Sequence, residues 1–235
     1  MNRGRLLSLC YLVSVVAGLD CIVAVTGLAF EARLAGCVAV VSDGVRTPAL
    51  LQKAISSGVR GILSFGVCGG LSPHLAPGQW VVASSILLGE EAHFPHQQWS
   101  QRLSAMLPRS IQGPILAVEQ LVASAKHKPE LYARTGAIAV DMESHFAAKV
   151  AAAHNLPFAS CRVVIDPAHR RLPPAALLNL RPGGAIDLRA VVQSVIRRPG
   201  QLPDLLRLAI DAFRAQSALR RGRALLGPTL LVPEA

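Results

Sequence analysis

The stretch RVVIDPA at residues 162–168 is an apolar, strand-like run with a carboxylate at its end, and AVDMES at residues 139–144 is a second such run. In α/β proteins the ends of strands and the loops after them gather into clefts, so we expect both carboxylates to face one. Paired carboxylates of this kind suit chemistry on a sugar with a basic leaving group, where one holds ribose hydroxyls and the other delivers a proton. The alternative interpretation is that both are buried or helix-capping side chains.

The rest of the chain alternates strand-like and helical runs, and no repeat or low-complexity linker divides it. We expect strands at residues 21–25, 37–41, 61–65, 79–84, 137–140 and 157–165. We expect a turn and the beginning of a helix within 26–33. Further helices are expected at 47–58, 98–106, 129–136, 143–154, 185–197 and 202–219. This order predicts a single α/β domain with a central mixed sheet flanked by helices. We place an apolar N-terminal extension at 1–20, the domain at 21–220 and a C-terminal tail at 221–235.

The composition is apolar and basic. Of 235 residues, 51% are hydrophobic and 4% aromatic, the mean hydropathy is +0.41, and 24 Lys and Arg against 14 Asp and Glu give a net charge of +10. The sequence has no aromatic platform for reading RNA and no recognition block of arginines, so we expect no nucleic acid partner. An anionic membrane surface or an anionic substrate fits this composition better.

Residues 6–18 form an apolar run behind Arg3 and Arg5, which is similar to the charged and apolar regions of a signal peptide. The run is shorter than a membrane-spanning helix needs. The competing interpretation is an N-terminal extension, or a start codon assigned too early. We favour the N-terminal extension because the rest of the chain is typical of a cytoplasmic protein.

The five cysteines are odd in number, lie in apolar runs and form no CxxC pair. We expect them to be reduced thiols in the core: Cys10, Cys21, Cys37, Cys68 and Cys161.

Glycines follow the expected strand at 61–65, in the run GVCGG at residues 66–70. Glycines at a strand end let a ligand approach the backbone and expose its N–H groups. The run is neither GxGxxG nor followed by GK[ST], so it predicts no dinucleotide or phosphate loop, and a tight turn is the alternative. His93 and His96 flank Pro95 without an acidic or thiolate partner. We therefore expect no metal and no cofactor.

Five elements in this order resemble the nucleoside phosphorylase superfamily, and most closely its nucleosidase branch, the 5′-methylthioadenosine/S-adenosylhomocysteine nucleosidases. They are the turn at 27–31, Ser42-Asp43-Gly44, the glycine run with Pro77-Gly78 behind it, the segment 140–143 and the segment 162–168. The resemblance covers residues 21–170. It implies a nucleoside phosphorylase-like fold, an enzyme that cleaves N-ribosyl bonds, and a homodimer.

The segments 25–33, 141–144 and 179–184, with two closing helices, are similar to the hopanoid-biosynthesis-associated phosphorylases. Those enzymes are thought to remove adenine from adenosylhopane. The resemblance therefore implies a 5′-substituted adenosine as substrate, with a lipid-linked 5′ group. A hopane group cannot reach the site from bulk solvent, and the net charge of +10 favours an anionic surface, so we expect a cytoplasmic enzyme that is peripheral at the inner membrane face.

The resemblance to the nucleoside phosphorylase superfamily and its nucleosidases implies roles for individual side chains. Asp166 matches the acid that protonates the leaving base, since adenine leaves poorly unless a ring nitrogen is protonated. Glu143 matches the residue that accepts hydrogen bonds from the ribose 2′- and 3′-hydroxyls. Glu31 matches the glutamate that orients the attacking water, and the alternative is a first-turn glutamate favoured by the helix dipole. The other substrate-binding positions are Met142 beneath the sugar and Gly66, Val67, Gly69 and Gly70.

Departures from the family pattern bear on the choice between water and phosphate. Members that use phosphate place a Ser and an Arg in and before the glycine run, where this chain has Val67 and Ser64. Arg46 and Arg33 are the nearby cations that could restore a phosphate site. We therefore favour hydrolysis over phosphorolysis.

A further departure concerns the acid itself. Nucleosidases carry Ser before the catalytic Asp, whereas this chain has Ile165, and His169 is a candidate to hold the acid instead.

Two other functions stay open. One is a purine or uridine phosphorylase, or a methylthioadenosine nucleosidase, of nucleoside salvage. The other is a non-catalytic, membrane-associated binder of a nucleoside lipid.

Overall fold

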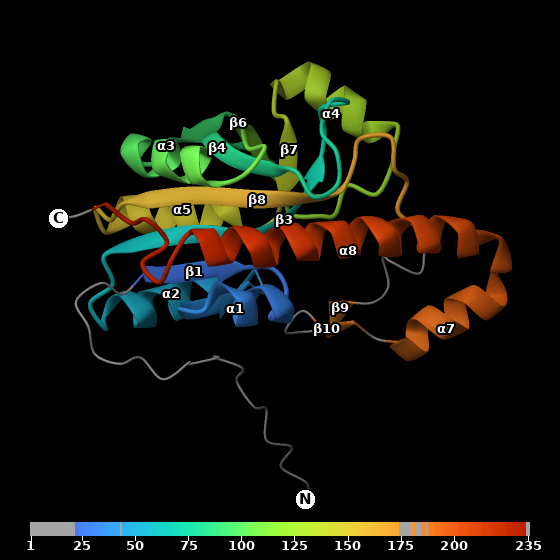
Figure 1. Cartoon of the computed structure of the whole chain (residues 1–235), viewed down its shortest axis with the longest axis horizontal. Helices are drawn as coiled ribbons and strands as arrows, with labels where there is room; N and C mark the ends of the chain where they lie inside the picture. The colour runs from blue at the N-terminus through green and yellow to red at the C-terminus, as the bar shows by residue number, and fades with distance from the viewer. Residues whose placement is uncertain (1–21, 43, 174–179, 182–184, 187, 234–235) are drawn as a thin grey trace, which may run out of the picture.

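The structure, a computed structural model, describes residues 22–42, 44–173, 180–181, 185–186 and 188–233. The expected extension at 1–20, Asp43 and most of the segment 179–184 lie outside the described residues. The predicted α/β class with a mixed sheet is confirmed (Figure 1). The strands are β1 (Ile22–Thr26), β2 (Val38–Val41), β3 (Gly61–Gly70), β4 (Trp80–Leu88), β5 (Glu91–His93), β6 (Ile111–Ala117), β7 (Ala139–Asp141), β8 (Phe158–Asp166), β9 (Leu180–Arg181) and β10 (Ala185–Ile186). The helices are α1 (Ala29–Ala35), α2 (Thr47–Ile55), α3 (Gln97–Met106), α4 (His127–Thr135), α5 (Ser144–Ala153), α7 (Leu188–Arg197) and α8 (Leu202–Leu225).

The main sheet closes on itself in its middle. Its order is β2-β1-β3-β7-β6-β4-β5, while β8 pairs with both β3 and β4, so that β3, β8, β4, β6 and β7 form a ring. β1 and β8 both run parallel to β3, and their carboxyl ends therefore meet at one edge. β7 runs antiparallel to β3 and pairs with its last residues, Gly69 and Gly70. This edge is where the two carboxylate-bearing segments come together.

Apolar side chains alternate between two core layers. On β1, Ile22 and Ala24 pack in the layer with α1, α3 and α8, whereas Val23 and Val25 pack in the layer with α2 and α5. Figure 1 shows α8 lying along the sheet and extending beyond it toward α7. Within the described part of the chain, no helix is both long enough and apolar enough to cross a membrane. The domain boundaries at residues 20 and 220 stay predictions.

The glycine run at 66–70, expected as a loop, is the second half of β3. Gly66, Val67 and Cys68 pair in register with β8, and the register shifts between Cys68 and Gly69. Such an irregularity bends a strand and is frequent beside active sites. The run is therefore part of the sheet rather than a loop, and the approach of a ligand to its backbone stays a prediction.

Other elements also differ from the prediction, which did not include β5, β9 or β10. β6 was not expected, since Gly113 and Pro114 within it are turn residues. A register shift in β4 between Ala83 and Ser85 accommodates the proline opposite it. The helix expected at 185–197 begins at Leu188, because β10 pairs with β9 just before it.

Candidate active site

The turn from β1 into α1 places Glu31 against the glycine run. β1 ends at Thr26, and Glu31 is fully buried in the first turn of α1. Its Oε2 accepts hydrogen bonds from the N–H groups of Gly27 and Leu28, both at 2.8 Å. Its Oε1 accepts one from the N–H of Val67 on β3, also at 2.8 Å. The carboxylate thus caps its own helix, as the alternative interpretation expects, and also ties α1 to β3.

Gly66 makes the room that Glu31 occupies. Its φ is +152°, and a Cβ at this position would lie 2.6 Å from the carboxyl carbon of Glu31. Gly27 does the same for Glu143, because a Cβ there would lie 2.5 Å from its Oε1. Both carboxylates therefore lie directly against glycine backbone.

Arg162 is the buried cation at the centre of the cluster and is 0% exposed. Its Nε lies 3.0 Å from Asp141 Oδ2, an ion pair outside hydrogen-bond alignment. Its Nη1 lies 3.0 Å from Glu143 Oε2. Nη2 donates to Ser64 Oγ at 2.6 Å, and Nη1 donates to the carbonyl of Val67 at 3.2 Å. One guanidinium on β8 thereby joins β3, the end of β7 and the turn before α5.

Two opposing effects determine the pKa values of the carboxyl groups in this cluster: burial and the positive charge of Arg162. Desolvation raises the pKa of Glu31 and of Glu143, and Arg162 opposes the rise in both. The side chain of Glu143 is 16% exposed, against 1% for Asp141. Of these two neighbours, Glu143 is therefore the one that a ligand can reach, and the partly buried Met142 lies between them in the chain.

Asp166 ends β8 beside Gly69, where a Cβ would lie 3.4 Å from its Oδ1. Its side chain is 6% exposed, and its Oδ2 accepts a hydrogen bond from Lys128 Nζ. Burial raises the pKa of Asp166 to about 6, and Lys128 opposes that rise. A general acid needs a pKa near the working pH, and Asp166 meets that need.

The structure thus places Glu31 beside Gly66 and Asp166 beside Gly69 on the glycine run, while Glu143 is connected to the same run through Arg162. Arg33 and Arg46 are both exposed, on α1 and just before α2. His169 is exposed as well, and Lys128 is the buried partner of the acid in its place.

Sequence reasoning missed two cations of this cluster. Arg162 lies inside the segment that carried the resemblance, but no role was given to it. Its signal was available, because an arginine among Cys and Val residues of a buried strand has to be paired. Lys128 gave no such signal, since it stands in a polar run at 126–130 and reaches Asp166 only through the fold.

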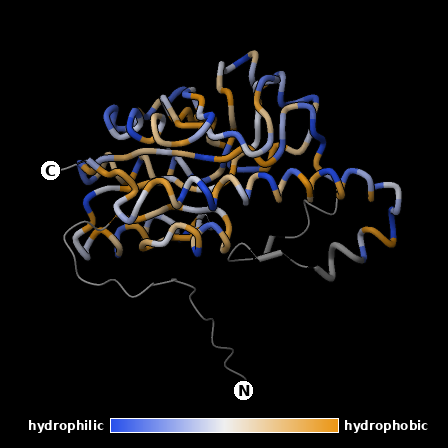
Figure 2. The backbone as a smooth tube through the Cα atoms, viewed as in Figure 1, coloured by the Kyte–Doolittle hydropathy of each residue, from blue (hydrophilic) through white to orange (hydrophobic). Residues whose placement is uncertain are grey.

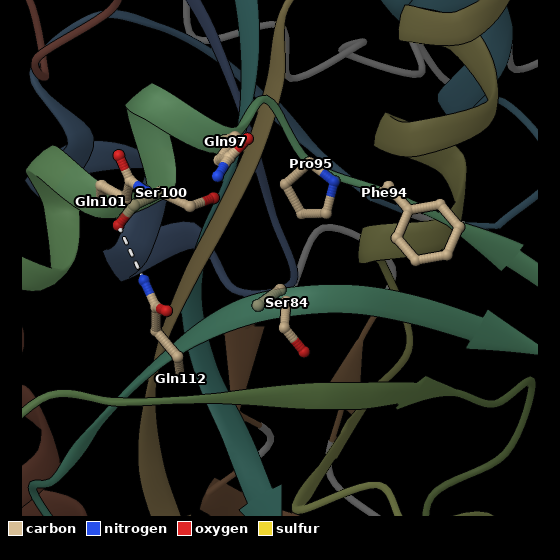
Figure 3. Close-up of a pocket in the computed structure, with 8 residues that line it drawn as sticks. Ser84, Phe94, Pro95, Gln97, Ser100, Gln101 and Gln112 are labelled. Carbon is tan, nitrogen blue, oxygen red and sulfur yellow. Dashed lines mark hydrogen bonds between the residues drawn. The ribbon is translucent and has the colours of Figure 1, made fainter.

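A cavity of about 380 Å³ lies away from these residues, between β4, β6 and α3 (Figure 3). Gln112 Nε2 donates to the carbonyl of Ser100 at 3.4 Å on its wall. The cavity is lined by Ala83, Ser84, Phe94, Pro95, Gln97, Ser100, Gln101 and Gln112, none of which is titratable. It therefore offers no acid or base for the chemistry considered above.

The two histidines beside this cavity have local partners. His96 accepts a hydrogen bond from the N–H of Trp99 at the start of α3, at 3.4 Å, and His93 lies 3.6 Å from Glu91. Over the residues that the structure describes, no group of His, Cys, Asp and Glu side chains is arranged to hold a metal ion.

A mixed α/β sheet with carboxylates gathered at a glycine-rich strand end fits a protein of the nucleoside-cleaving class. Residues 7–197 match the family described as the phosphorylase superfamily. The chain therefore belongs to the phosphorylase superfamily, and the predicted fold and the predicted enzyme class, N-ribosyl nucleosidase or phosphorylase, are confirmed at that level. Comparison with curated proteins finds no match in sequence.

Solved structures share this fold at low identity. The Helicobacter pylori 5′-methylthioadenosine/S-adenosylhomocysteine nucleosidase, complexed with a pyrrolidine compound, is 15% identical with a TM-score of 0.62, covering 91% of this chain and 99% of its own. A mutant of the same enzyme with 5′-methylthioadenosine in the active site is 15% identical with a TM-score of 0.60, covering 88% and 98%. The Helicobacter pylori futalosine hydrolase is 14% identical with a TM-score of 0.62, covering 90% and 97%.

Proposed function

We propose that this protein hydrolyses the N-ribosidic bond of a 5′-substituted adenosine and releases adenine, with adenosylhopane of hopanoid biosynthesis as its substrate. The observation that carries the proposal is that Glu31 and Glu143 lie close to Arg162, while Asp166 lies farther along the same glycine run, beside Gly69. The similar structures include nucleosidases, one of them with 5′-methylthioadenosine bound. The lipid-linked 5′ group in this proposal rests on the sequence resemblance to the hopanoid-biosynthesis-associated phosphorylases.

Each carboxylate has a chemical task in this reaction, which passes through an oxocarbenium-like sugar. Asp166 gives a proton to a ring nitrogen of the base, so that the electron pair of the N-ribosidic bond leaves on neutral adenine. Glu143 accepts hydrogen bonds from the ribose hydroxyls, and Met142 lies beneath the sugar. Glu31 is 0% exposed, so it can orient only a water that is itself buried in the site, and its Oε1 has acceptor capacity left for one beside its bond from the N–H of Val67.

The charge of the cluster favours water over phosphate as the acceptor. In the described part of the chain, two buried cations, Arg162 and Lys128, face four carboxyl groups. Asp166 is neutral while it carries the proton for the base, and the three that remain as carboxylates are Glu31, Asp141 and Glu143. This surplus of acidic groups stabilises a cationic sugar and disfavours a phosphate anion.

Release of free adenine tests the proposal. The protein is incubated with adenosylhopane, methylthioadenosine and inosine, each with and without phosphate, and the free base is followed. We expect adenine from the two adenosine derivatives, fastest from adenosylhopane, at a rate that phosphate does not change. Phosphate-dependent release with a ribose 1-phosphate product would instead indicate a salvage phosphorylase. Tight binding without release would indicate a nucleoside-lipid binder.

A substrate with a hopane group stays in the membrane, and we propose that the enzyme is cytoplasmic and takes it from the inner membrane face as a peripheral homodimer. The surface that supports this is an apolar stripe on α8, whose side chains are 45 to 72% exposed. They are spaced by four, four and three residues, which puts them on one helix face: Leu202, Leu206, Ile210 and Phe213. Arg207, Arg214 and Arg221 follow at seven-residue spacing beside them. Figure 2 shows hydrophobic and hydrophilic residues alternating along this helix.

Vesicle binding is the measurement for this surface. We expect the protein to sediment with vesicles that contain anionic lipid and to be released by salt, since each basic residue near such a surface contributes about 1 kcal/mol. The double variant Leu206→Ser, Phe213→Ser should bind about tenfold less, because its apolar anchor is lost, and should still release adenine from methylthioadenosine. Its mass in solution should match the wild-type dimer. Equal binding to neutral and anionic vesicles, or a variant that changes only the oligomeric state, would remove the membrane role.

A further inference from the structure

Lys128 is a fully buried lysine beside the acid of the proposed site. It lies at the start of α4, and its side chain is 0% exposed. Its Nζ donates to Asp166 Oδ2. It also faces the backbone carbonyls of Asp166 at 3.4 Å, Pro167 at 3.1 Å and Arg170 at 3.3 Å. Lysine is almost never fully buried unless paired, and here all of its donors have acceptors. The ammonium is thereby fixed to the loop that follows β8.

Few other charges act on the same carboxyl. Asp211 on α8 faces it, but Arg170 holds Asp211 through hydrogen bonds of 3.0 and 2.7 Å and offsets its charge. Cys68 on β3 lies near, and burial raises the pKa of its thiol well above the ordinary value, so it stays neutral. Lys128 is therefore the charge that most directly sets the state of Asp166.

We propose that Lys128 is a positioning residue that aims the Asp166 carboxyl at the leaving base and stabilises the carboxylate left after proton transfer. This rests on the proposed function. The proton moves from an Asp166 Oδ to a ring nitrogen of the base, and the electron pair of the N-ribosidic bond leaves with the base. The negative charge that remains on Asp166 lies against the ammonium of Lys128, which keeps its own protons. Asp166 regains a proton from water after the base has left.

The pH profile of Lys128→Met tests this role. Without the opposite charge, Asp166 holds its proton to higher pH, so the alkaline fall of kcat/KM for adenine release should move up by about 1 pH unit or more. On the acidic side of that fall, kcat should drop about tenfold or more, because a weaker acid transfers its proton more slowly, while KM changes little. Lys128→Arg should restore part of both. The matched control is Lys149→Met on α5, a half-exposed lysine 3.0 Å from Glu91, which should leave the profile unchanged.

Thermal unfolding gives a readout that does not depend on catalysis. A carboxyl whose pKa is higher in the folded than in the unfolded state adds stability at low pH, and loses it as the pH rises through the folded pKa. The Tm of Lys128→Met should therefore fall further below wild type at pH 8 than at pH 5. Adding Asp166→Asn to that variant should remove the difference.

The outcomes separate the two proposals. An active wild type whose Lys128→Met variant keeps the wild-type pH limb, or has the same Tm deficit at both pH values, overturns the role of Lys128 alone. A wild type that releases no base from any substrate overturns the proposed function, and this role with it.

Discussion

Asp166→Asn is expected to slow adenine release by about 10²–10⁴-fold, the range that general acid catalysis contributes. The amide keeps the shape of the carboxyl but cannot give a proton to the base, so kcat should fall while KM stays nearly constant. Lys128 loses its ionic partner but keeps its carbonyl acceptors on Asp166, Pro167 and Arg170, so we expect the variant to fold. Steady-state kinetics with methylthioadenosine, with Tm measured alongside, checks the expectation.

The control for lost charge is Asp204→Asn on α8, whose side chain is 45% exposed and pairs with Arg207. It should retain the wild-type rate. If Asp166→Asn kept more than about half of the wild-type rate, Asp166 would have no part in the mechanism.

The pH dependence of the wild type follows from the same carboxyl. Burial raises the pKa of Asp166 to about 6. The acid form that catalysis needs exists below this pKa and is lost above it. Burial also raises the pKa of Glu143, to about 7, so its carboxylate form becomes available over the pH range in which the acid form of Asp166 is lost. We therefore expect the fall in kcat/KM that belongs to Asp166 to begin above about pH 6, and that fall should be absent from the residual activity of Asp166→Asn.

The strands and helices were predictable where the local sequence pattern of the segment itself specifies the element. The strand at 157–165 and the helix at 143–154 are continuous apolar or amphipathic runs, and both appear in the structure within one or two residues. β6 was missed because local propensity weighs against Gly113 and Pro114, while pairing with β4 and β7 holds them in the sheet. The ring of strands depends on β8 pairing with both β3 and β4, which no local pattern records.

The site was predictable only as far as its acids. The carboxylates stand at or just after the ends of apolar runs, where sequence can find them. Glu31 and Asp166 lie against the glycine run, and Glu143 is connected to it through Arg162. The cations that hold them are different. Lys128 reaches Asp166 across 38 residues of chain, and nothing in its own polar segment records that it is buried. Positions that act through a long-range partner become visible only once the fold has placed that partner.

Glu143→Gln should lower kcat/KM for adenine release by about 10²-fold or more. Each hydrogen bond from a ribose hydroxyl to this charged acceptor contributes about 1.5–3 kcal/mol, and two are proposed. Arg162 Nη1 lies 3.0 Å from one oxygen of Glu143 and can only donate, so it orients the glutamine with its carbonyl oxygen toward the guanidinium. The amide NH₂ then takes the place of the oxygen beside Gly27. A donor therefore meets the ribose hydroxyls where an acceptor is needed.

The 2′-deoxy analogue of methylthioadenosine turns this into a test of the sugar assignment. It lacks one of the two hydroxyls, so Glu143→Gln should cost it about tenfold less than it costs the ribose substrate, a difference of about 1.4 kcal/mol. Glu130→Gln, which removes a charge from a side chain 70% exposed on α4, should affect neither substrate. If Glu143→Gln impairs the ribose and deoxyribose substrates equally, Glu143 serves the ion pair with Arg162 rather than the sugar. The acid role of Asp166 would survive that result, because it depends on the base and not on the ribose hydroxyls.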